Sequence, residues 1–222
     1  MTTARDRRGS TVREATLRAW SRSHTRPLPK KKLTFKQFLD WADEDTWAEW
    51  VNGEVIPMGP ARVSHQAIAD FLMALLRLYV EAHDLGTVMS APFLMKLTQS
   101  GREPDVIFVR RSRLKQFTDV YLRGPADLVV EVVSPDSRHR DRHEKFLEYE
   151  REGVREYWLI DPIREQAEFH RRSRKGSFAP IAVANGVFRS AVLKGLWLEV
   201  AWLWQKPMPT LMSVLKAWKL VT

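Results

Sequence analysis

The chain has 222 residues, which allows one domain of ordinary size or one domain with a tail. Hydrophobic residues make up 44% of the sequence, enough for a packed core, and no apolar run is long enough to span a membrane. Cysteine is absent, which excludes a disulfide framework and a cysteine-based zinc site and makes a reducing cytoplasm the simplest location.

The net charge of +9 is concentrated near the N-terminus. Residues 1–32 contain ten Lys or Arg and two Asp or Glu, whereas the other 190 residues contain 26 basic and 25 acidic side chains. We predict that residues 1–32 form a basic disordered tail; a phosphate-contacting arm, a targeting presequence and a start codon assigned too early are the alternatives. Because the rest of the chain is nearly neutral, the overall basicity does not by itself indicate nucleic-acid binding.

The first predicted elements are a short helix and a β-hairpin. Thr34 and Gln37 have the spacing of a capping box, which predicts a helix over residues 35–43. The dipeptide Asn52-Gly53 stands between two strand-like runs and predicts a tight hairpin turn, because both residue types tolerate positive φ angles.

A long helix and four strands are expected next. Ser64 is placed to cap a helix from His65 to about His83, in which apolar residues recur at helical spacing along one face. The strand candidates are residues 87–90, 93–97, 106–109 and 128–133.

One more long helix and several short strands complete the predicted domain. The helix runs from about Arg138 to Glu152, and Gly153 ends it. Short strands are expected at "EYWLID", "AEFHRR", "FAPIAV", "GVFRS" and "GLWLEV", before a final short helix at Thr210–Trp218. This order of elements predicts a single α/β (α+β) domain over residues 33–222.

A carboxylate stands inside the strand predicted at "DLVVEVV". Residues 128–133 are apolar on both faces except at Glu131, a pattern that is typical of a central strand covered on both sides. An uncompensated ionised carboxylate in such a place costs on the order of tens of kcal/mol. Glu131 must therefore be protonated, paired with a cation or bound to a metal ion.

Neighbouring segments carry further charged side chains. Asp105 begins the apolar strand of "EPDVIFV", and Asp141, Lys145 and Tyr149 are spaced four residues apart, which places them along one face of the following helix. Two carboxylates at adjacent strand ends, with a lysine from the next helix, predict a cation site. Hard oxygen ligands and the absence of thiols favour Mg²⁺ or Mn²⁺.

Structural roles for the same residues remain open. Asp105 could cap a turn, and Lys145 could pair with Asp141 on a solvated helix face. For Glu131 the competing interpretation is a static, buried ion pair with Lys145. The spacing alone does not separate such a pair from a metal site.

Five stretches of the chain carry a family resemblance: "NGEVIPMGP", "SHQAIADFL", "REPDVIFV", "GPADLVVEVVSPDSRHRDRHEKFLEYEREGVREYWLIDP" and "GLWLEV". Together they resemble the Uma2 family, a bacterial group labelled as putative restriction endonucleases within the PD-(D/E)xK nuclease superfamily. The resemblance covers about residues 33–220, and residues 124–162 are its most specific part.

This resemblance implies a restriction-endonuclease-like core, with a mixed central β-sheet flanked by helices, an early β-hairpin and a β-rich C-terminal segment. It also implies a Mg²⁺- or Mn²⁺-dependent endonuclease that hydrolyses DNA. In that scheme the catalytic residues are Asp105 of the "PD" motif, Glu131 of the second motif and the motif lysine, Lys145. Asp105 and Glu131 would hold the metal.

Four further residues match the family less directly. Glu54 follows the hairpin turn and matches an acidic position that could add a third metal ligand. His65 matches a histidine near the start of the long helix, and Asp141 and Tyr149 flank the lysine in the "D…K…Y" stretch. We expect accessory roles for these four residues.

The chain departs from the superfamily pattern at one position. The lysine normally stands two residues after the glutamate, where this chain has Val133. Residues two apart in a strand share a face, so a lysine there would have reached the same site that Lys145 could serve from the helix. The alternative function is a catalytically silent nuclease-fold module, for binding or regulation, with a static Glu131–Lys145 pair.

Partners are indicated only by composition and by the resemblance. DNA is the expected substrate, although the chain has no helix-turn-helix, zinc-finger or RRM signature. Candidate phosphate contacts, with a solvated basic face as the alternative, are Arg110, Arg111, Arg113 and Lys115 in one cluster and Arg138, Arg140 and Arg142 in another. A homodimer is consistent with cutting two strands, and four C-terminal tryptophans are expected in the core or at an interface.

Overall fold

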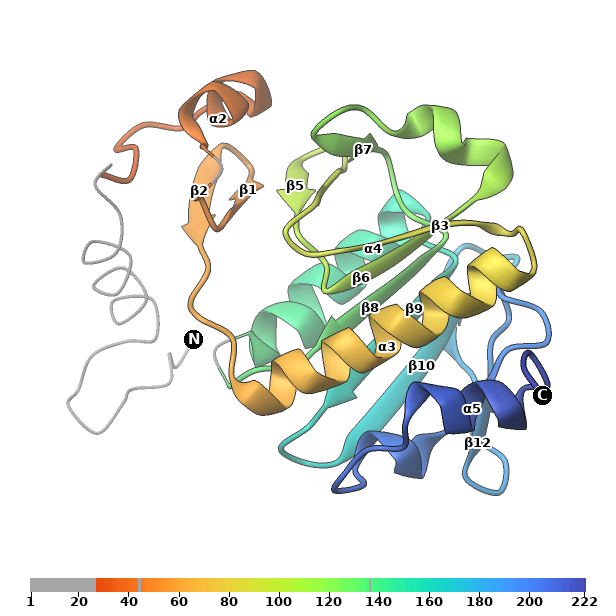
Figure 1. Ribbon diagram of the computed structural model, residues 1–222. Helices are drawn as coiled ribbons and strands as arrows, with labels where there is room; N and C mark the ends of the chain where they lie inside the picture. The colour runs from red at the N-terminus through yellow and green to blue at the C-terminus, as the bar shows by residue number, and fades with distance from the viewer. Residues whose placement is uncertain (1–26, 44, 136) are drawn as a thin grey trace.

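The structure is a computed structural model that describes residues 27–43, 45–135 and 137–222 (Figure 1). Its centre is a six-stranded sheet in the order β11-β10-β9-β8-β6-β3, in which β8 and β9 are parallel and the other neighbours are antiparallel. The strands are β3 (Gly86–Ser90), β6 (Val106–Arg110), β8 (Leu128–Val132), β9 (Glu156–Asp161), β10 (Gln166–Arg172) and β11 (Phe178–Pro180). The mixed central sheet predicted from the sequence is therefore confirmed.

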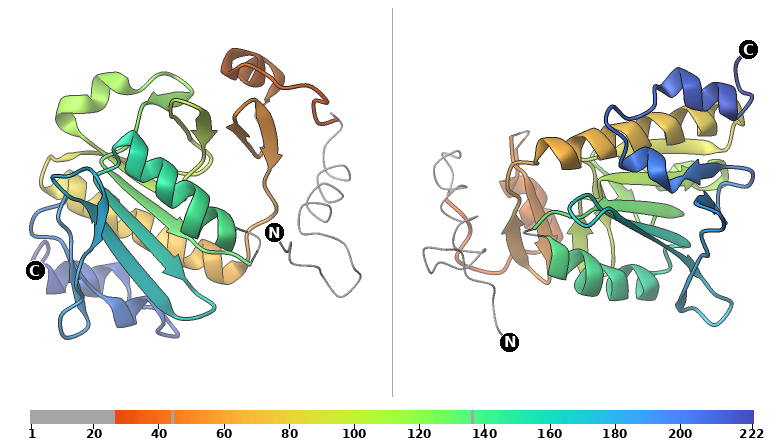
Figure 2. Two further views of the ribbon diagram at one scale, coloured as in Figure 1. Left: turned by 180° about the vertical axis from the view of Figure 1, so that it is seen from behind. Right: turned by 90° about the horizontal axis from the view of Figure 1, so that it is seen from below.

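Helices cover both faces of this sheet (Figures 1 and 2). They are α3 (Val63–Ala82) and α5 (Leu211–Ala217) on one face, and the π-helical turn η2 (Arg140–Lys145) continuing into α4 (Phe146–Glu152) on the other. Val130 and Val132 of β8 belong to the core cluster under α3, whereas Val129 and Val133 belong to the cluster under α4. The two apolar faces of this strand are buried for that reason.

A second sheet carries the N-terminal hairpin, in the order β2-β1-β5-β4-β7. Its strands are β1 (Ala48–Val51), β2 (Glu54–Pro57), β4 (Leu94–Lys96), β5 (Ser100–Arg102) and β7 (Tyr121–Arg123). The turn between β1 and β2 has φ angles of 52° at Asn52 and 87° at Gly53, as the dipeptide predicts. Helix α2 (Phe35–Trp41) precedes it, and Thr34 and Gln37 form the predicted capping box.

The C-terminal segment packs on the α3 face of the central sheet. It contains β12 (Val187–Arg189), β13 (Trp197–Glu199) and the 3₁₀ turn η3 (Val200–Leu203), before α5. Trp202 is buried in the core there, and the indole of Trp218 donates a hydrogen bond to the Trp197 carbonyl at 3.0 Å. Trp202 is therefore a core residue, whereas Trp197 and Trp218 are partly buried against the core.

Several local predictions need correction. Ser64 lies inside α3 rather than capping it, because the helix begins at Val63 and its N-cap Arg62 makes no side-chain capping bond. The short strands β5 and β7 and the 3₁₀ turn η1 (Arg111–Gln116) were not predicted, since three-residue strands carry little periodic signal. The predicted tail, residues 1–32, falls mostly on residues 1–26, which lie outside the described residues. Leu28 packs against the small apolar cluster of Phe38, Ala48, Trp50 and Leu94.

No helix in the described ranges combines the length and apolar character that crossing a membrane requires.

Candidate active site

Asp105 and Glu131 meet at one end of the central sheet. Val106 of β6 is paired with Val130 of antiparallel β8. In this register the adjoining residues, Asp105 and Glu131, stand opposite each other. Oδ2 of Asp105 accepts a hydrogen bond from the Val132 amide at 2.6 Å, which holds the carboxylate against β8. The two carboxylates therefore lie at adjacent strand ends, where the sequence placed them.

Lys145 is the cation beside Glu131. Its Nζ lies 2.8 Å from Glu131 Oε1, 3.1 Å from Glu49 Oε1 and 3.6 Å from Asp141 Oδ1, and the side chain is 1% exposed. The hydroxyl of Tyr149 donates to the same Glu131 oxygen at 2.7 Å. The helical face predicted from the spacing of Asp141, Lys145 and Tyr149 is thus buried against the sheet, at the end of a π-helical turn of a kind that often marks functional sites.

Glu49 of β1 is a buried carboxylate that the sequence analysis missed. Its Oε2 lies 2.9 Å from Arg102 Nη1, and Arg102 in turn lies 2.7 Å from Glu148 of α4. These contacts join the hairpin to the helix that carries Lys145. The available signal was the same as for Glu131, an acidic residue inside the apolar strand "AEWV".

Glu54, the hairpin acid that was expected to bind the metal, occupies a different environment. It is exposed at the start of β2 beside the turn, paired with Val51. The hairpin carboxylate that is buried and contacts Lys145 is instead Glu49, which stands two residues before Val51. A metal-binding role for Glu54 stays a prediction.

Replacement of the two hairpin glutamates by Gln should separate their roles. We expect Glu49→Gln to lower the free energy of unfolding by about 3 kcal/mol, because it removes the carboxylate shared by the buried Lys145 and Arg102. Glu54→Gln should change it by less than about 0.5 kcal/mol, as is usual for an exposed side chain. Urea denaturation followed by circular dichroism measures both, and equal losses would contradict the assignment.

His65 reaches the carboxylates from the first turn of α3. Its Nε2 lies 3.3 Å from Asp105 Oδ2, and in the described part of the chain its buried Nδ1 has no hydrogen-bond partner. Burial lowers the pKa of His65, but the hydrogen bond and negative charge of Asp105 outweigh it, so that the pKa is raised above its ordinary value. His65 is therefore suited to hold a proton at this end of the sheet.

Burial and neighbouring charges shift the pKa values of the buried cluster around Lys145. Burial raises the pKa of Glu131 from 4.5 to about 8; nearby carboxylates act in the same direction and Lys145 opposes it. Burial by itself lowers the pKa of Lys145, but the surrounding carboxylates raise it above the ordinary value, so the lysine stays charged. Burial also raises the pKa of Asp141. Burial is the largest cause of the raised pKa of both carboxyl groups.

The raised pKa of Glu131 predicts a pH dependence of stability in the metal-free protein. Because the folded state binds the proton more tightly than the unfolded state, this contribution is fully present below about pH 4.5 and is lost as pH rises through about 8. Relative to Glu131→Gln, the wild type should therefore lose stability between pH 5 and pH 9, by on the order of a few kcal/mol. Urea unfolding in EDTA measures this, and parallel curves for the two proteins would contradict it.

The donor set fits a hydrated divalent cation. In residues 27–43, 45–135 and 137–222, no three His, Asp or Glu side chains surround a common metal position, which argues against an all-side-chain cage. Mg²⁺, however, is commonly bound by one or two carboxylates and keeps several waters. The adjacent carboxylates of Asp105 and Glu131 meet that requirement.

The predicted phosphate-contacting arginines pair with acids of the protein. Arg138 and Arg142 contact buried Asp161 at 3.3 and 3.4 Å, at the same end of the sheet as Asp105 and Glu131, and Arg140 lies 3.9 Å from Glu49. The other cluster is at the opposite end of β6 from Asp105. There, Arg110 and Arg113 contact buried Asp127, and Arg111 pairs with Asp84.

Comparison with known proteins gives one family and one fold. The family model described as "Uma2: Putative restriction endonuclease" matches residues 35–201. A crystal structure described as a putative nuclease belonging to DUF820, from Anabaena variabilis, has a TM-score of 0.66 and 17% sequence identity, covering 78% of this chain and 97% of that one. No curated protein matches the sequence.

Proposed function

Because the chain belongs to the Uma2 family, described as putative restriction endonucleases, we propose that it is a divalent-metal-dependent endonuclease that hydrolyses phosphodiester bonds of DNA. The observation that carries the proposal is the meeting of Asp105 and Glu131 at adjacent strand ends, with buried Lys145 donating to Glu131 at 2.8 Å. Fold similarity alone would not support an activity, since one fold hosts many functions.

Asp105 and Glu131 would hold Mg²⁺ or Mn²⁺, and Oδ1 and Oε2 are suited to it because Oδ2 and Oε1 already accept hydrogen bonds. When bound, such an ion lowers the pKa of a coordinated water and neutralises charge on the phosphoryl oxygens. The protein fixes the two carboxylates beforehand, through the Val132 amide on one side and Tyr149 on the other. Such preorganisation removes reorganisation cost at the moment of reaction.

Lys145 and His65 have different roles in this proposal. Because its pKa is raised, Lys145 remains protonated and acts as a fixed positive charge that orients the attacking water and stabilises the developing anion, rather than as a base. His65, held by Asp105 and with a raised pKa, is the candidate donor of a proton to the leaving oxygen.

Metal titration with a cleavage assay tests the proposal. Mg²⁺ and Mn²⁺ are titrated into the full chain by calorimetry, and supercoiled plasmid is incubated with the protein in each metal and in EDTA. We expect binding of a divalent ion and conversion of supercoiled to nicked plasmid, both abolished by EDTA. The absence of binding at millimolar metal would overturn the metal-dependent mechanism.

A second candidate is a catalytically silent module of the same fold that binds or regulates a partner. The observation that favours it is that Lys145 is already compensated by three carboxylates, those of Glu49, Glu131 and Asp141, without an added ion. This candidate predicts neither metal binding nor nicking in the same experiment.

A further inference from the structure

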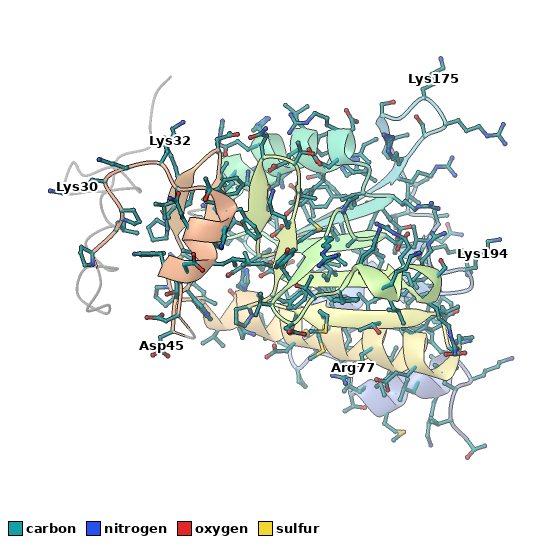
Figure 3. The ribbon with its side chains drawn as sticks, turned by 90° about the horizontal axis from the view of Figure 1, so that it is seen from above. Lys30, Lys32, Asp45, Arg77, Lys175 and Lys194 are labelled. Carbon is teal, nitrogen blue, oxygen red and sulfur yellow. The ribbon has the colours of Figure 1, made fainter. Side chains whose placement is uncertain are left out.

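A basic pocket lies at the opposite end of the central sheet from Asp105 and Glu131. It has a volume of about 840 Å³, and its lining includes residues 191–193 and the side chains of Arg110, Arg155, Arg171, Arg172 and Lys194. These five side chains are the cationic residues of the lining, which contains no acidic residue. Figure 3 shows Lys194 at the end of the molecule opposite the N-terminal residues Lys30, Lys32 and Asp45.

Strand pairing brings the arginines of the pocket together. The amide of Asp127 donates a hydrogen bond to the carbonyl of Phe108, and Phe108 stands two residues before Arg110. The carbonyl of Asp127 accepts a hydrogen bond from the Arg155 amide at 3.2 Å. Arg155 in turn accepts at its carbonyl from the Arg172 amide at 2.8 Å. Arg110, Arg155 and Arg172 therefore follow one another across the ends of β6, β9 and β10, although they are far apart in the sequence.

Asp127 contacts two arginines of the pocket, Arg110 and Arg155, and also Arg113, which lies outside its lining. Its carboxylate is fully buried and lies 2.7 Å from Arg110 Nε, 3.2 Å from Arg113 Nη1 and 3.4 Å from Arg155 Nε. One carboxylate thus orients two of the five cationic side chains of the pocket, so the lining keeps a net positive charge. Positive charge gathered in a concave site raises the local concentration of anions.

The far wall of the pocket, residues 191–194, is fixed by hydrogen bonds. Buried Glu156 accepts from the amides of Ala191 and Val192 at 2.7 and 2.8 Å, and the hydroxyl of Tyr79 donates to the Lys194 carbonyl at 2.9 Å. The wall is therefore formed before any ligand arrives, as is usual for small-molecule sites.

We propose that this pocket binds a phosphate-bearing ligand, independently of the carboxylate site. Arginine side chains present paired donors that match phosphate oxygens, and several fixed cations suit a multiply charged anion better than a single carboxylate. The volume is in the range of nucleotide-sized ligands. The phosphate could belong to a free polyphosphate or to the 5′ end of a nucleic-acid strand.

Calorimetry in EDTA tests the pocket while keeping the carboxylate site free of metal. The probes are sodium triphosphate, 5′-phosphorylated tetrathymidylate and the same tetranucleotide without its phosphate. The test variant is Arg155→Gln/Lys194→Gln, which should fold because both side chains are exposed and Asp127 keeps Arg110 and Arg113. The charge-matched control is Lys36→Gln/Lys216→Gln, on exposed positions of α2 and α5.

We expect 1:1 binding of triphosphate or of the phosphorylated tetranucleotide, weakened at least about tenfold in the test variant and unchanged in the control. Preference for triphosphate would identify a free polyphosphate as the ligand; preference for the phosphorylated over the unphosphorylated strand would identify a strand end. Absence of binding, or equal loss in both variants, would overturn the proposal. Binding should persist in Asp105→Asn/Glu131→Gln, and its loss there would place the ligand at the carboxylates instead.

Discussion

The double variant Asp105→Asn/Glu131→Gln is expected to lose metal-dependent plasmid nicking by about 10³-fold or more, and with it the binding of Mg²⁺ and Mn²⁺. Both substitutions keep the shape of the side chain and remove its negative charge. The amide oxygens can still accept from the Val132 amide and from Tyr149, which limits structural change. Nicking on agarose gels and calorimetric titration measure the two losses on the same protein.

The matched control for that experiment is Asp70→Asn/Asp119→Asn. Both of these aspartates are exposed, on α3 and after η1, so the control removes the same charge from outside the site. It should retain wild-type nicking and metal binding. If the double variant at the carboxylate site still nicked plasmid at the wild-type rate, the active-site assignment would be wrong and a contaminating nuclease would have to be sought.

Lys145→Met is expected to cause the largest loss of stability, about 3–5 kcal/mol in the free energy of unfolding. Methionine has a similar length, but it leaves Glu49, Glu131 and Asp141 buried without the ammonium group that faces all three. The same change should abolish nicking, because the fixed positive charge at the site disappears. Urea denaturation measures the stability, and Lys115→Met at an exposed position is the control.

A double-mutant cycle with Glu131→Gln distinguishes an isolated ion pair from a larger cluster. A pair that stood alone would make Glu131→Gln/Lys145→Met nearly as stable as the wild type, because both charges would be gone. In this structure Glu49 and Asp141 remain beside the missing ammonium group, so the second substitution should restore only part of the loss. Full restoration would contradict the three-carboxylate arrangement.

The carboxylate pair was predictable because it rests on local patterns. Glu131 is conspicuous inside a strand that is apolar on both faces, and Asp105 begins the neighbouring apolar run. The spacing of Asp141, Lys145 and Tyr149 indicates one helical face, and that face is buried even though the chain there is a π-helical turn before it becomes α-helical. In each case, a charged side chain that is costly to bury could be recognised from the apolar residues within a few positions of it.

The hairpin acid and the arginine clusters were not predictable in the same way. Whether Glu49 or Glu54 reaches Lys145 depends on how β1 packs and pairs, and its partner β5 is a three-residue strand with no periodic signal. Arg110 follows Asp105 closely in the sequence, but the intervening strand carries it to the other end of the sheet. A strand of five residues is about 17 Å long, so neighbours in sequence can belong to different sites.

The sequence by itself determined the mixed α/β class, the hairpin turn at Asn52-Gly53 and the acidic strand residue that needs a cation, because side-chain periodicity and turn chemistry are local properties. Only the tertiary structure decided which cation that is and which other residues share it. It brought Glu49, Arg102 and Lys145 together from three separate elements, and it gathered Arg110, Arg155 and Arg172 into a pocket at the far end. The physical reason is that ion pairs and pockets depend on contacts between residues distant in sequence, which strand order and register establish and local patterns do not encode.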